Sequence, residues 1–438
     1  CAPARLVVKA PPMPEPTEGP ASAPAISERR LLFLLGAVQF VNVVDFVMVL
    51  PLGPDFARAL GIPTHQLGLI AGSYTASAAL AGLVAATFLD RFDRRRALLV
   101  AMLGLVLGTA TGGAALGLGS MLLARLLAGA FGGPATSLSL SILTDCVPPE
   151  RRGRAIGKVM GAFSIASVLG VPAGLELARV GGWQLPFFAI ATLGALVSIA
   201  AAALLPPMRG HLRAAVGAPP RQPLAALLAE RVVPLSLAGT AVAMIGSFSI
   251  ISNLSSFVQF NLGYPRADLG LLYMAGGSVS FFSMRLAGWC ADRWGAPWVV
   301  AAGTALVVAV IGLAFVPARP LIPVVGMFVG FMLANSTRLV GFNTLTTRVP
   351  APAERARFMS LQSAVQHLST SAGATLSTAV LHERADQSLE GMARLAGFAI
   401  VVSAALPVIA WLLDRRLRAR SASTIVATAP ASARSAAP

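Results

Sequence analysis

The sequence predicts an all-α membrane protein with twelve transmembrane helices in two pseudo-symmetric six-helix bundles. Of its 438 residues, 56% are hydrophobic and only 12% are charged, and the mean hydropathy is +0.75. An ordinary soluble domain carries about 25% charged residues, so most of this chain cannot face water. Apolar stretches of roughly 20 residues, each long enough to cross the hydrocarbon core of a bilayer, recur along the chain. Alternation of polar and apolar residues is absent, which argues against a β-barrel.

The predicted helices follow one another with short connections. In the first half they cover about residues 31–52, 67–89, 97–118, 121–144, 155–177 and 184–205. In the second half they cover about residues 233–260, 268–290, 298–316, 321–346, 358–380 and 393–413. The expected units are therefore a bundle of residues 28–206, a polar connector of residues 207–231 and a bundle of residues 232–416. Residues 1–27 and 417–438, rich in Pro, Ala and Ser, are expected to be disordered tails.

The distribution of charge predicts the orientation of the chain. The net charge is +16, which in a soluble protein would suggest a nucleic-acid partner. Here the arginines gather in loops on one side of the predicted helices, together with the residues that flank both ends. By the positive-inside rule, both termini and the connector are cytoplasmic, and the partner is a lipid bilayer. The Arg-rich, Lys-poor composition suggests a bacterial inner membrane. The three cysteines are expected to be small apolar fillers and not disulfides.

The two halves of the sequence look like copies of each other. A nearly constant offset relates Asp90 to Asp292, the Arg152–Arg154 segment to the Arg355–Arg357 segment, and Gly170 to Gly373. One offset at three separate places indicates duplication of a six-helix unit. Duplicated halves joined by a connector suit rocking about a shared central site.

Two charged loops carry a resemblance to a known family. Residues 86–96 read ATFLDRFDRRR, and residues 288–295 repeat the beginning of this pattern as GWCADRWG. They resemble the G-x-x-x-D-R-x-G-R-R loop motif of the major facilitator superfamily, although Ala86 and Asp93 replace its glycines. The resemblance covers nearly all of residues 30–415. It implies the fold of that superfamily and transport of a solute by alternating access.

The resemblance implies that these loops form a latch between the halves on the cytoplasmic side in the outward-open state. Asp90 and Arg94 are four residues apart and can pair on a helical turn. In the family the acid also faces the N-terminus of the eleventh helix, where the helix dipole favours an anion. The expected latch residues are Asp90, Arg91, Arg94, Asp145, Asp292 and Arg293. The second copy is expected to be weaker, because Ala296 and Arg348 stand where Arg94 and Asp145 stand in the first. The alternative is positive charge that only sets the topology.

Two further motifs lie in the fourth and fifth predicted helices. The fifth contains Gly161, Gly170, Pro172 and Gly174, and it resembles a shortened form of the family's antiporter motif, which is associated with drug-type exporters. Small residues permit close helix approach and Pro172 permits a bend; ordinary packing is the alternative. In the fourth, Arg125 with Gly129 resembles an R-x-x-x-G motif whose arginine is implicated in proton coupling. Arg125 could instead bind backbone carbonyls of the first helix as a structural contact.

Asp45 is the acid that lies well inside a predicted span. A charge at this depth is costly, so it should face a central cavity or a partner. Its surroundings, DFVMVLP, resemble the first helix of drug- and sugar-exporting family members. We predict that Asp45 carries the coupled proton and that Arg125 tunes it. The alternative is a buried Asp that is permanently paired with Arg.

Other intramembrane polar residues are candidates for a substrate cavity. Arg338 has no counterpart in the first half, where Ala135 occupies the matching position, so we expect a substrate contact or a salt bridge to Asp45. His367 could titrate or could be a packing residue. The full predicted set is Gln39, Asn42, Asn253, Arg338, Gln366 and His367, with Gln362 nearby.

The sequence contains no Walker A loop, no metal-ligand spacing and no nucleophile motif, so we expect neither an enzyme nor a cofactor. The main hypothesis is a monomeric, proton-coupled antiporter that exports small molecules. One alternative is an importer or uniporter of a small nutrient, in which Asp45 binds the substrate. Another is a non-transporting membrane receptor or scaffold. The sequence does not identify the substrate.

Overall fold

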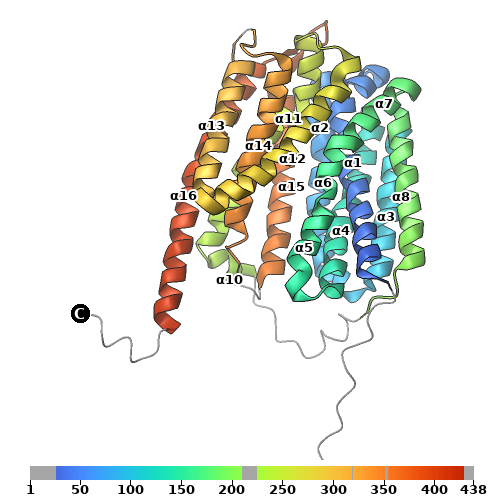
Figure 1. Cartoon of the computed structure of the whole chain (residues 1–438). Coiled ribbons are helices and arrows are strands. Elements are labelled where there is room, and N and C mark those ends of the chain that lie inside the picture. Colours follow the sequence, from blue (N-terminus) through green and yellow to red (C-terminus); the bar gives the residue numbers. More distant parts are fainter. Residues whose placement is uncertain (1–25, 210–223, 318, 351–353, 429–438) are drawn as a thin grey trace, which may run out of the picture.

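The computed structural model describes residues 26–209, 224–317, 319–350 and 354–428. It is almost entirely helical (Figure 1). The N-terminal half (residues 26–209) contains α1 Glu28–Leu60, α2 Leu67–Phe88, α3 Arg94–Gly113, α4 Leu118–Cys146, α5 Pro149–Met160, α6 Ala162–Ile165, α7 Val171–Gly181 and α8 Gln184–Leu204. The C-terminal half (residues 224–428) contains α10 Leu224–Ala229, α11 Val232–Ser256, α12 Leu269–Trp294, α13 Ala296–Phe315, α14 Val324–Thr346, α15 Arg355–Val380 and α16 Met392–Thr428.

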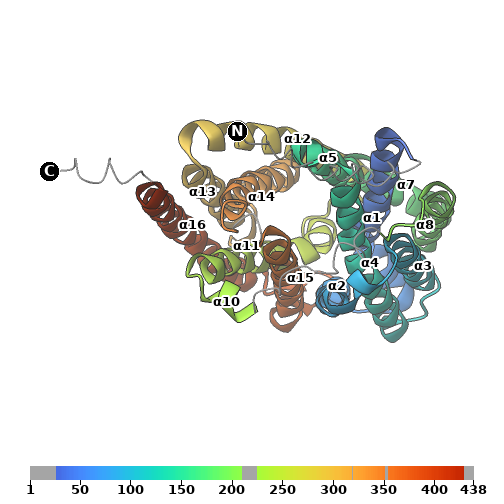
Figure 2. The ribbon, with the colours of Figure 1, turned by 90° about the horizontal axis from the view of Figure 1, so that it is seen from below.

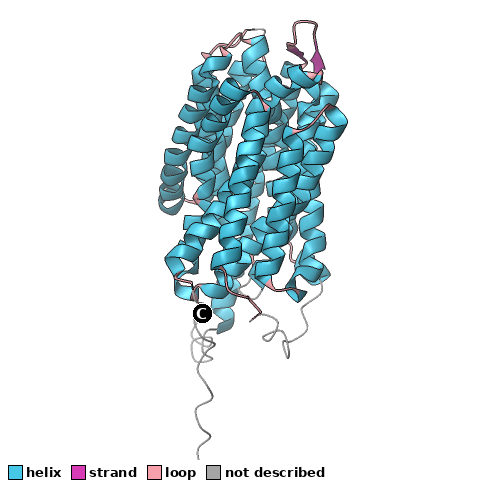
Figure 3. Ribbon diagram, turned by 90° about the vertical axis from the view of Figure 1, so that its right-hand side faces the viewer, coloured by secondary structure: helices cyan, strands magenta, loops and turns pink. Residues whose placement is uncertain are grey.

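Short elements join or extend these helices. They are the 3-10 turns η1 Thr64–Gln66, η2 Leu89–Arg91 and η5 Arg266–Asp268, and the π turns η3 Ala166–Gly170 and η4 Phe257–Asn261. Strands β1 His382–Glu383 and β2 Leu389–Glu390 pair antiparallel as a hairpin between α15 and α16, which Figure 3 shows at one end of the molecule.

The helices are long and apolar enough for a membrane. By length and composition, ten helical segments of the described chain qualify as spans. α12 and α15 have comparable lengths but more polar side chains, such as Arg285 in α12 and Gln362 and Gln366 in α15. With these two, the described chain has twelve long helical segments, which equals the number of spans that the sequence predicts.

Seen from below, α1–α8 lie on one side and α11–α16 on the other (Figure 2). We call the end at which α1 begins and α16 ends the terminal end. There Arg151 pairs with Glu28 at 3.0 Å and Arg420 pairs with Glu230 at 3.0 Å. The opposite end, which carries β1 and β2, is called the hairpin end.

Several boundaries differ from the sequence prediction. α1 continues to Leu60 through Pro51 and Pro54, because tertiary packing buries both prolines. α16 continues to Thr428, so residues 417–428 are helical and not part of a disordered tail. Their alanines and arginines are good helix formers. Residues 1–25, 210–223 and 429–438 of the expected tails and connector lie outside the described residues.

Close helix approach joins the two halves near the hairpin end. A Cβ on Gly68 of α2 would lie 2.1 Å from the carbonyl oxygen of Ala374 in α15, and one on Gly72 would lie 2.6 Å from the Thr375 hydroxyl. A Cβ on Gly277 of α12 would likewise lie 2.9 Å from the Ser167 carbonyl oxygen. Only glycine allows these backbones to meet, as in other membrane helix interfaces.

Candidate functional site

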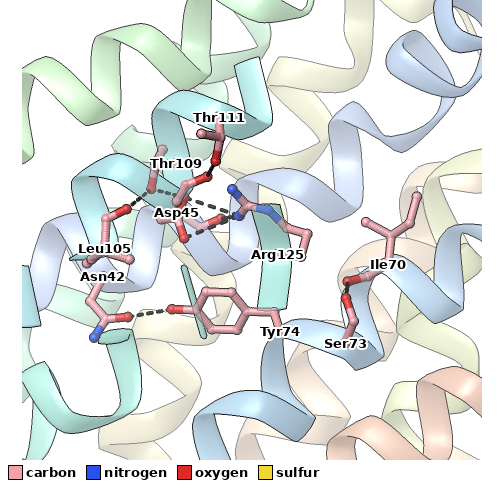
Figure 4. A network of polar contacts seen from close by, with 10 residues as sticks. Asn42, Asp45, Ile70, Ser73, Tyr74, Leu105, Thr109, Thr111 and Arg125 are labelled. Atoms are coloured by element: carbon pink, nitrogen blue, oxygen red, sulfur yellow. Dashed lines mark hydrogen bonds and ion pairs between the residues drawn. The ribbon is translucent and has the colours of Figure 1, made fainter. Parts of the chain in front are cut away.

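A fully buried ion pair joins α1 to α4. Arg125 Nη1 lies 3.2 Å from Asp45 Oδ1 and 3.3 Å from Oδ2, and these side chains are 1% and 0% exposed (Figure 4). The guanidinium lies over the Phe187 ring at 5.3 Å and close to Gly112, where a Cβ would lie 2.9 Å from Nη2. Both predicted coupling residues therefore meet, inside the N-terminal half.

The hydroxyl of Thr109 on α3 completes this site. It lies 2.7 Å from Asp45 Oδ1 and 2.9 Å from the carbonyl oxygen of Leu105 (Figure 4). A hydroxyl has one hydrogen and two acceptor lone pairs. It can therefore donate to a charged Asp45 carboxylate, or donate to Leu105 while it accepts a hydrogen from a protonated Asp45. Thr109 can therefore form a hydrogen bond with either protonation state of Asp45.

A second polar network lies beside the ion pair. Asn42 Oδ1 accepts from the Tyr74 hydroxyl at 2.7 Å (Figure 4). Asn42 Nδ2 donates to the Gly132 carbonyl at 2.6 Å and to the Thr136 hydroxyl at 2.7 Å. Asn42 is thus hydrogen-bonded on both sides of its amide and connects α1 to α2 and α4.

The glycine motif of the fifth spanning segment supports α1 directly. A Cβ on Gly170 would lie 2.6 Å from Val44 Cγ2, and one on Gly174 would lie 3.0 Å from Met48 Sδ. Val44 and Met48 flank Asp45 in the chain. The π turn η3 of this segment ends at Gly170, two residues before Pro172, whose missing N–H removes one helical hydrogen bond.

The opposite face of α1 contacts the other half. Phe46 stacks on Tyr74 with ring centroids 5.3 Å apart and lies 6.2 Å from Phe248 of α11. Gln39 shares this face by its spacing of seven residues from Phe46. Gln39 is 2% exposed, and its Oε1 has no hydrogen-bond partner among the described residues. α1 therefore joins the Asp45 ion pair to the boundary between the halves.

Arg338 occupies a separate site in the C-terminal half, and it does not form the expected salt bridge to Asp45. Its guanidinium donates to the hydroxyls of Ser403, at 3.0 Å, and Ser247, and to Asn335 Oδ1 at 2.9 Å. It also donates to the Ala243 carbonyl oxygen at 3.2 Å. These acceptors hold α14 against α11 and α16, whereas the partner of Asp45 is Arg125. Polarity alone could not show which half of the protein Arg338 contacts.

The remaining predicted cavity residues are spread along α11 and α15. Asn253 is buried and donates to the Ser377 hydroxyl at 2.7 Å, and its Oδ1 has no partner in the described chain. Gln362 donates to Thr346 of α14 at 3.2 Å. Gln366 is exposed. His367 is half-buried and lies four residues before Ser371, whose carbonyl oxygen is near Gly72, so its spacing places it on the α2-facing side of α15.

The latch residues are described in part. Arg94 Nε lies 2.5 Å from Asp145 Oδ2, which joins the start of α3 to the end of α4 as predicted. Asp292 and Arg293 are exposed at the end of α12, and Arg293 lies over the Trp289 ring at 5.6 Å. The side chain of Asp90 lies outside the described set, so its pairing with Arg94 stays a prediction.

Sequence reasoning missed a polar cluster at the hairpin end. Arg266 Nε contacts both carboxylate oxygens of Asp55, at 2.9 and 2.8 Å, across the two halves. Nearby, Arg58 Nη2 donates to Gln387 at 3.4 Å, and the Thr64 backbone N–H donates to Glu383 at 2.5 Å. These residues lie in loops and helix ends that share no motif. Their opposite charges at the same end of the predicted helices could have indicated that they pair.

Comparisons with known proteins agree with this architecture. The family model described as Major Facilitator Superfamily matches residues 35–374. A chloramphenicol resistance protein of Streptomyces lividans is 26% identical over 318 residues, which are 73% of this chain and 80% of that protein. A chloramphenicol efflux pump of Mycobacterium tuberculosis is 26% identical over 282 residues, which are 64% of this chain and 67% of that protein.

Solved structures show the same fold. A bacterial homologue of the human lysosomal transporter Spinster, in an inward-facing and unoccupied conformation, superposes with a TM-score of 0.70 at 18% identity. That match covers 89% of this chain and 98% of the other. A D-xylose-proton symporter has a TM-score of 0.69 at 16% identity, with coverages of 88% and 97%. The chain belongs to the Major Facilitator Superfamily of membrane transporters.

Proposed function

We propose that this transporter is a proton-coupled antiporter that exports small molecules, with both termini in the cytoplasm. The observation that carries the proposal is the Asp45–Arg125 pair, which is closed to solvent and has a hydroxyl that suits both protonation states. The name of the Mycobacterium tuberculosis relative, a chloramphenicol efflux pump, supports export, and the chloramphenicol resistance protein of Streptomyces lividans agrees with a drug as the exported molecule. The packing of Gly170 and Gly174 against α1 supports a role of the glycine motif in positioning Asp45.

The mechanism follows from the cost of a buried charge. Protonation of Asp45 removes the negative charge that compensates Arg125. A buried cation that loses its partner costs about 3–5 kcal/mol, so the surroundings must rearrange. Arg125 Nε and Nη2 have no hydrogen-bond partner among the described residues, and they offer donors to a new acceptor. Any shift of α1 also moves Phe46, which contacts Phe248 in the other half. Proton binding is thereby joined to the relative position of the halves.

Transport into everted membrane vesicles tests this proposal. Chloramphenicol is the first probe, followed by a panel of growth inhibitors. A proton gradient set before the assay should drive probe accumulation, and Asp45→Asn should abolish that accumulation. Glu176→Gln is the matched control, because Glu176 is an exposed acid of the same half that pairs with Arg179 on its own helix.

The alternatives give different results. An importer of a nutrient would accumulate its substrate in intact cells and not in everted vesicles. A uniporter would equilibrate the probe without regard to uncouplers. If Asp45→Asn keeps proton-driven accumulation at the wild-type rate, Asp45 is not the coupling acid and the buried pair is structural.

A further inference from the structure

A cavity outside the proposed transport site opens beside the loop between α2 and α3. Its volume is about 580 Å³, and its walls come from α2, α3, α4 and the chain that follows α8. This size is typical of small-molecule sites. Val84, Val100 and Phe131 line its apolar part, while Arg91, Arg96 and Arg209 lie at its terminal-end margin.

The apolar part of the cavity faces the bilayer. Val84 and Val100 are 60% and 62% exposed on helices that cross the membrane. Side chains exposed at such positions meet acyl chains. The arginines stand where α2 ends and α3 begins, which is the level of the lipid headgroups.

The charges at the margin suit an anion. The acid of the cavity, Asp93, already accepts from the backbone N–H groups of Arg95 and Met208 and from Arg209 Nε at 3.3 Å. Arg91 and Arg96 are exposed, and neither has an ion pair with any residue that the structure describes. Two cationic side chains are therefore directed to the same polar margin as the apolar groove.

The duplicated half does not repeat this arrangement. By the offset that relates Asp90 to Asp292, Trp298 stands where Arg96 stands, and Ala296 stands where Arg94 stands. The loop between α12 and α13 thus keeps Arg293 but lacks a second arginine at the matching place. A feature present in one copy only is not required by the six-helix fold.

We propose that this cavity is a binding site for an anionic phospholipid of the membrane leaflet at the terminal end. The phosphate contacts Arg91 and Arg96, and an acyl chain lies in the groove over Val84, Val100 and Phe131. The bound lipid joins the α2–α3 loop to the start of the connector, where Asp93 and Arg209 are paired.

Lipid binding can be measured on the purified full-length protein in a neutral detergent. Phosphatidylglycerol is titrated, with phosphatidylcholine as the uncharged comparison, while native mass spectrometry counts retained lipid and thermal unfolding reports stabilisation. Phosphatidylglycerol should bind the wild type and raise its unfolding temperature. The Arg91→Gln/Arg96→Gln variant should need about twenty-five-fold more lipid, because each basic residue near a lipid surface contributes roughly fivefold.

Matched variants separate this site from general charge. Arg154→Gln/Arg415→Gln removes two exposed arginines of the same end away from the cavity, and it should bind like the wild type. Arg91→Lys/Arg96→Lys keeps the charge and should retain most of the binding. Equal affinity of the Arg91→Gln/Arg96→Gln variant and the Arg154→Gln/Arg415→Gln control would overturn the proposal.

The groove is tested separately from the headgroup. Ala130→Phe places a ring in the apolar part of the cavity without changing an arginine, and it should lower phosphatidylglycerol retention at least tenfold. Inorganic phosphate at matched ionic strength should not displace the lipid. Unchanged retention in Ala130→Phe, or displacement by phosphate alone, would show a simple anion site and refute the lipid assignment.

Discussion

At Asp45, the hydroxyl group of one neighbouring residue can bond to both protonation states of the carboxyl group. Thr109 lies 2.7 Å from the carboxylate. We predict that Thr109→Val shifts the pH profile of proton-driven exchange toward higher pH, by up to about one pH unit. Both protonation states lose a hydrogen bond to Thr109, but the charged carboxylate loses the stronger, charge-assisted one, and the difference is about 1 kcal/mol. Exchange rates in vesicles between pH 5 and pH 9 measure the shift.

Thr109→Ser keeps the hydroxyl and is the control, with the pH profile expected to stay at the wild-type position. If Thr109→Val lowers the exchange rate at every pH but leaves the pH of the maximum unchanged, Thr109 only packs against α1. That result would contradict its role at the proton site.

Arg338 gives a second prediction at this scale. Its guanidinium is held by Ser403, Ser247 and Asn335, so we expect Arg338→Gln to destabilise the protein and to leave the KM for the exported probe unchanged. Each buried hydrogen bond between membrane helices contributes roughly 0.6 kcal/mol, which sums to about 2 kcal/mol for the three acceptors on other helices, Ser403, Ser247 and the Ala243 carbonyl oxygen. Thermal unfolding and transport kinetics measure the two effects.

Arg285→Gln is the comparison, because Arg285 is an exposed arginine of the same half that lies over Phe281 at 3.9 Å. A raised KM in Arg338→Gln with normal unfolding would restore the other hypothesis, direct contact with substrate.

Individual residues differ in how well the sequence reveals them. Asp45 and Arg125 stand out because ionised groups are costly in an apolar helix, and their pairing satisfies both. Thr109 and Tyr74 could not be selected, because hydroxyls are common in membrane helices and usually bond their own backbone. Arg338 was identified as unusual, but its partners come from helices that are distant in sequence.

At the scale of elements, the segment Pro149–Gly181 acts as the support for α1. We predict that Gly170→Ala lowers stability by about 1–3 kcal/mol and slows transport, because the new methyl group would lie 2.6 Å from Val44. Unfolding temperature and initial transport rate are the measurements.

Gly157→Ala is a close control in the same segment, since nothing lies within 4 Å of its Cβ position. It should be neutral or slightly stabilising, as expected for alanine in an exposed helix. Equal effects of the two substitutions would show that α1 packing does not explain the glycine at position 170.

The start of α3 carries a prediction about pH. Burial opposes ionisation of Asp93, but hydrogen bonds from the backbone of Met208, Arg95 and Arg96 and from the Arg209 side chain outweigh it and hold the pKa of Asp93 below its ordinary value. Because the pKa is lowered in the folded protein, the ionised carboxylate stabilises the fold at every pH above the ordinary pKa of an aspartate. This stabilisation is lost as the pH falls through the lowered pKa. Asp93→Asn should therefore unfold more easily than the wild type at pH 7, by about 1 kcal/mol, because hydrogen bonds to a charged carboxylate are stronger than those to a neutral amide, and this gap should close in acid.

Unfolding curves recorded from pH 7 down to pH 3 give the comparison. A gap for Asp93→Asn that keeps its size in acid would mean that the ionised carboxylate is not the source of the stability.

The sequence predicts which segments form spanning helices, but it does not predict where each helix ends or where its hydrogen-bonding pattern changes. Apolar length fixes which segments cross the membrane, but Pro51 and Pro54 suggested an early end to α1. The structure keeps that helix, and the Pro51 carbonyl oxygen accepts from Ser255 of the other half at 3.1 Å. The π turn before Pro172 and the β1–β2 hairpin likewise depend on tertiary packing that periodicity does not encode.

At the scale of the whole molecule, the duplication and the twelve spans followed from the sequence, but the arrangement of the halves did not. Polar contacts between the halves gather at the hairpin end, where Asp55, Arg58 and Thr64 meet Arg266, Gln387 and Glu383. The residue pairs of this cluster have no fixed spacing in the chain. They close one end of the molecule, and alternating access requires that end to open.

We predict that Asp55→Asn weakens closure at the hairpin end. The ion pair with Arg266 is partly buried, with side chains 21% and 29% exposed, and its loss should shift the open-to-closed ratio roughly five- to tenfold. In a background without cysteine, spin labels at Ala59→Cys and Ala385→Cys report the distance across this end, and the longer component should grow. The swapped pair Asp55→Arg/Arg266→Asp should restore closure, because it keeps one charge of each sign. Glu230→Gln breaks an exposed ion pair with Arg420 at the terminal end, inside one half, and should leave the distances unchanged. If Asp55→Asn gives the wild-type distribution, helix packing at Gly68 and Gly72 closes this end without the ion pair.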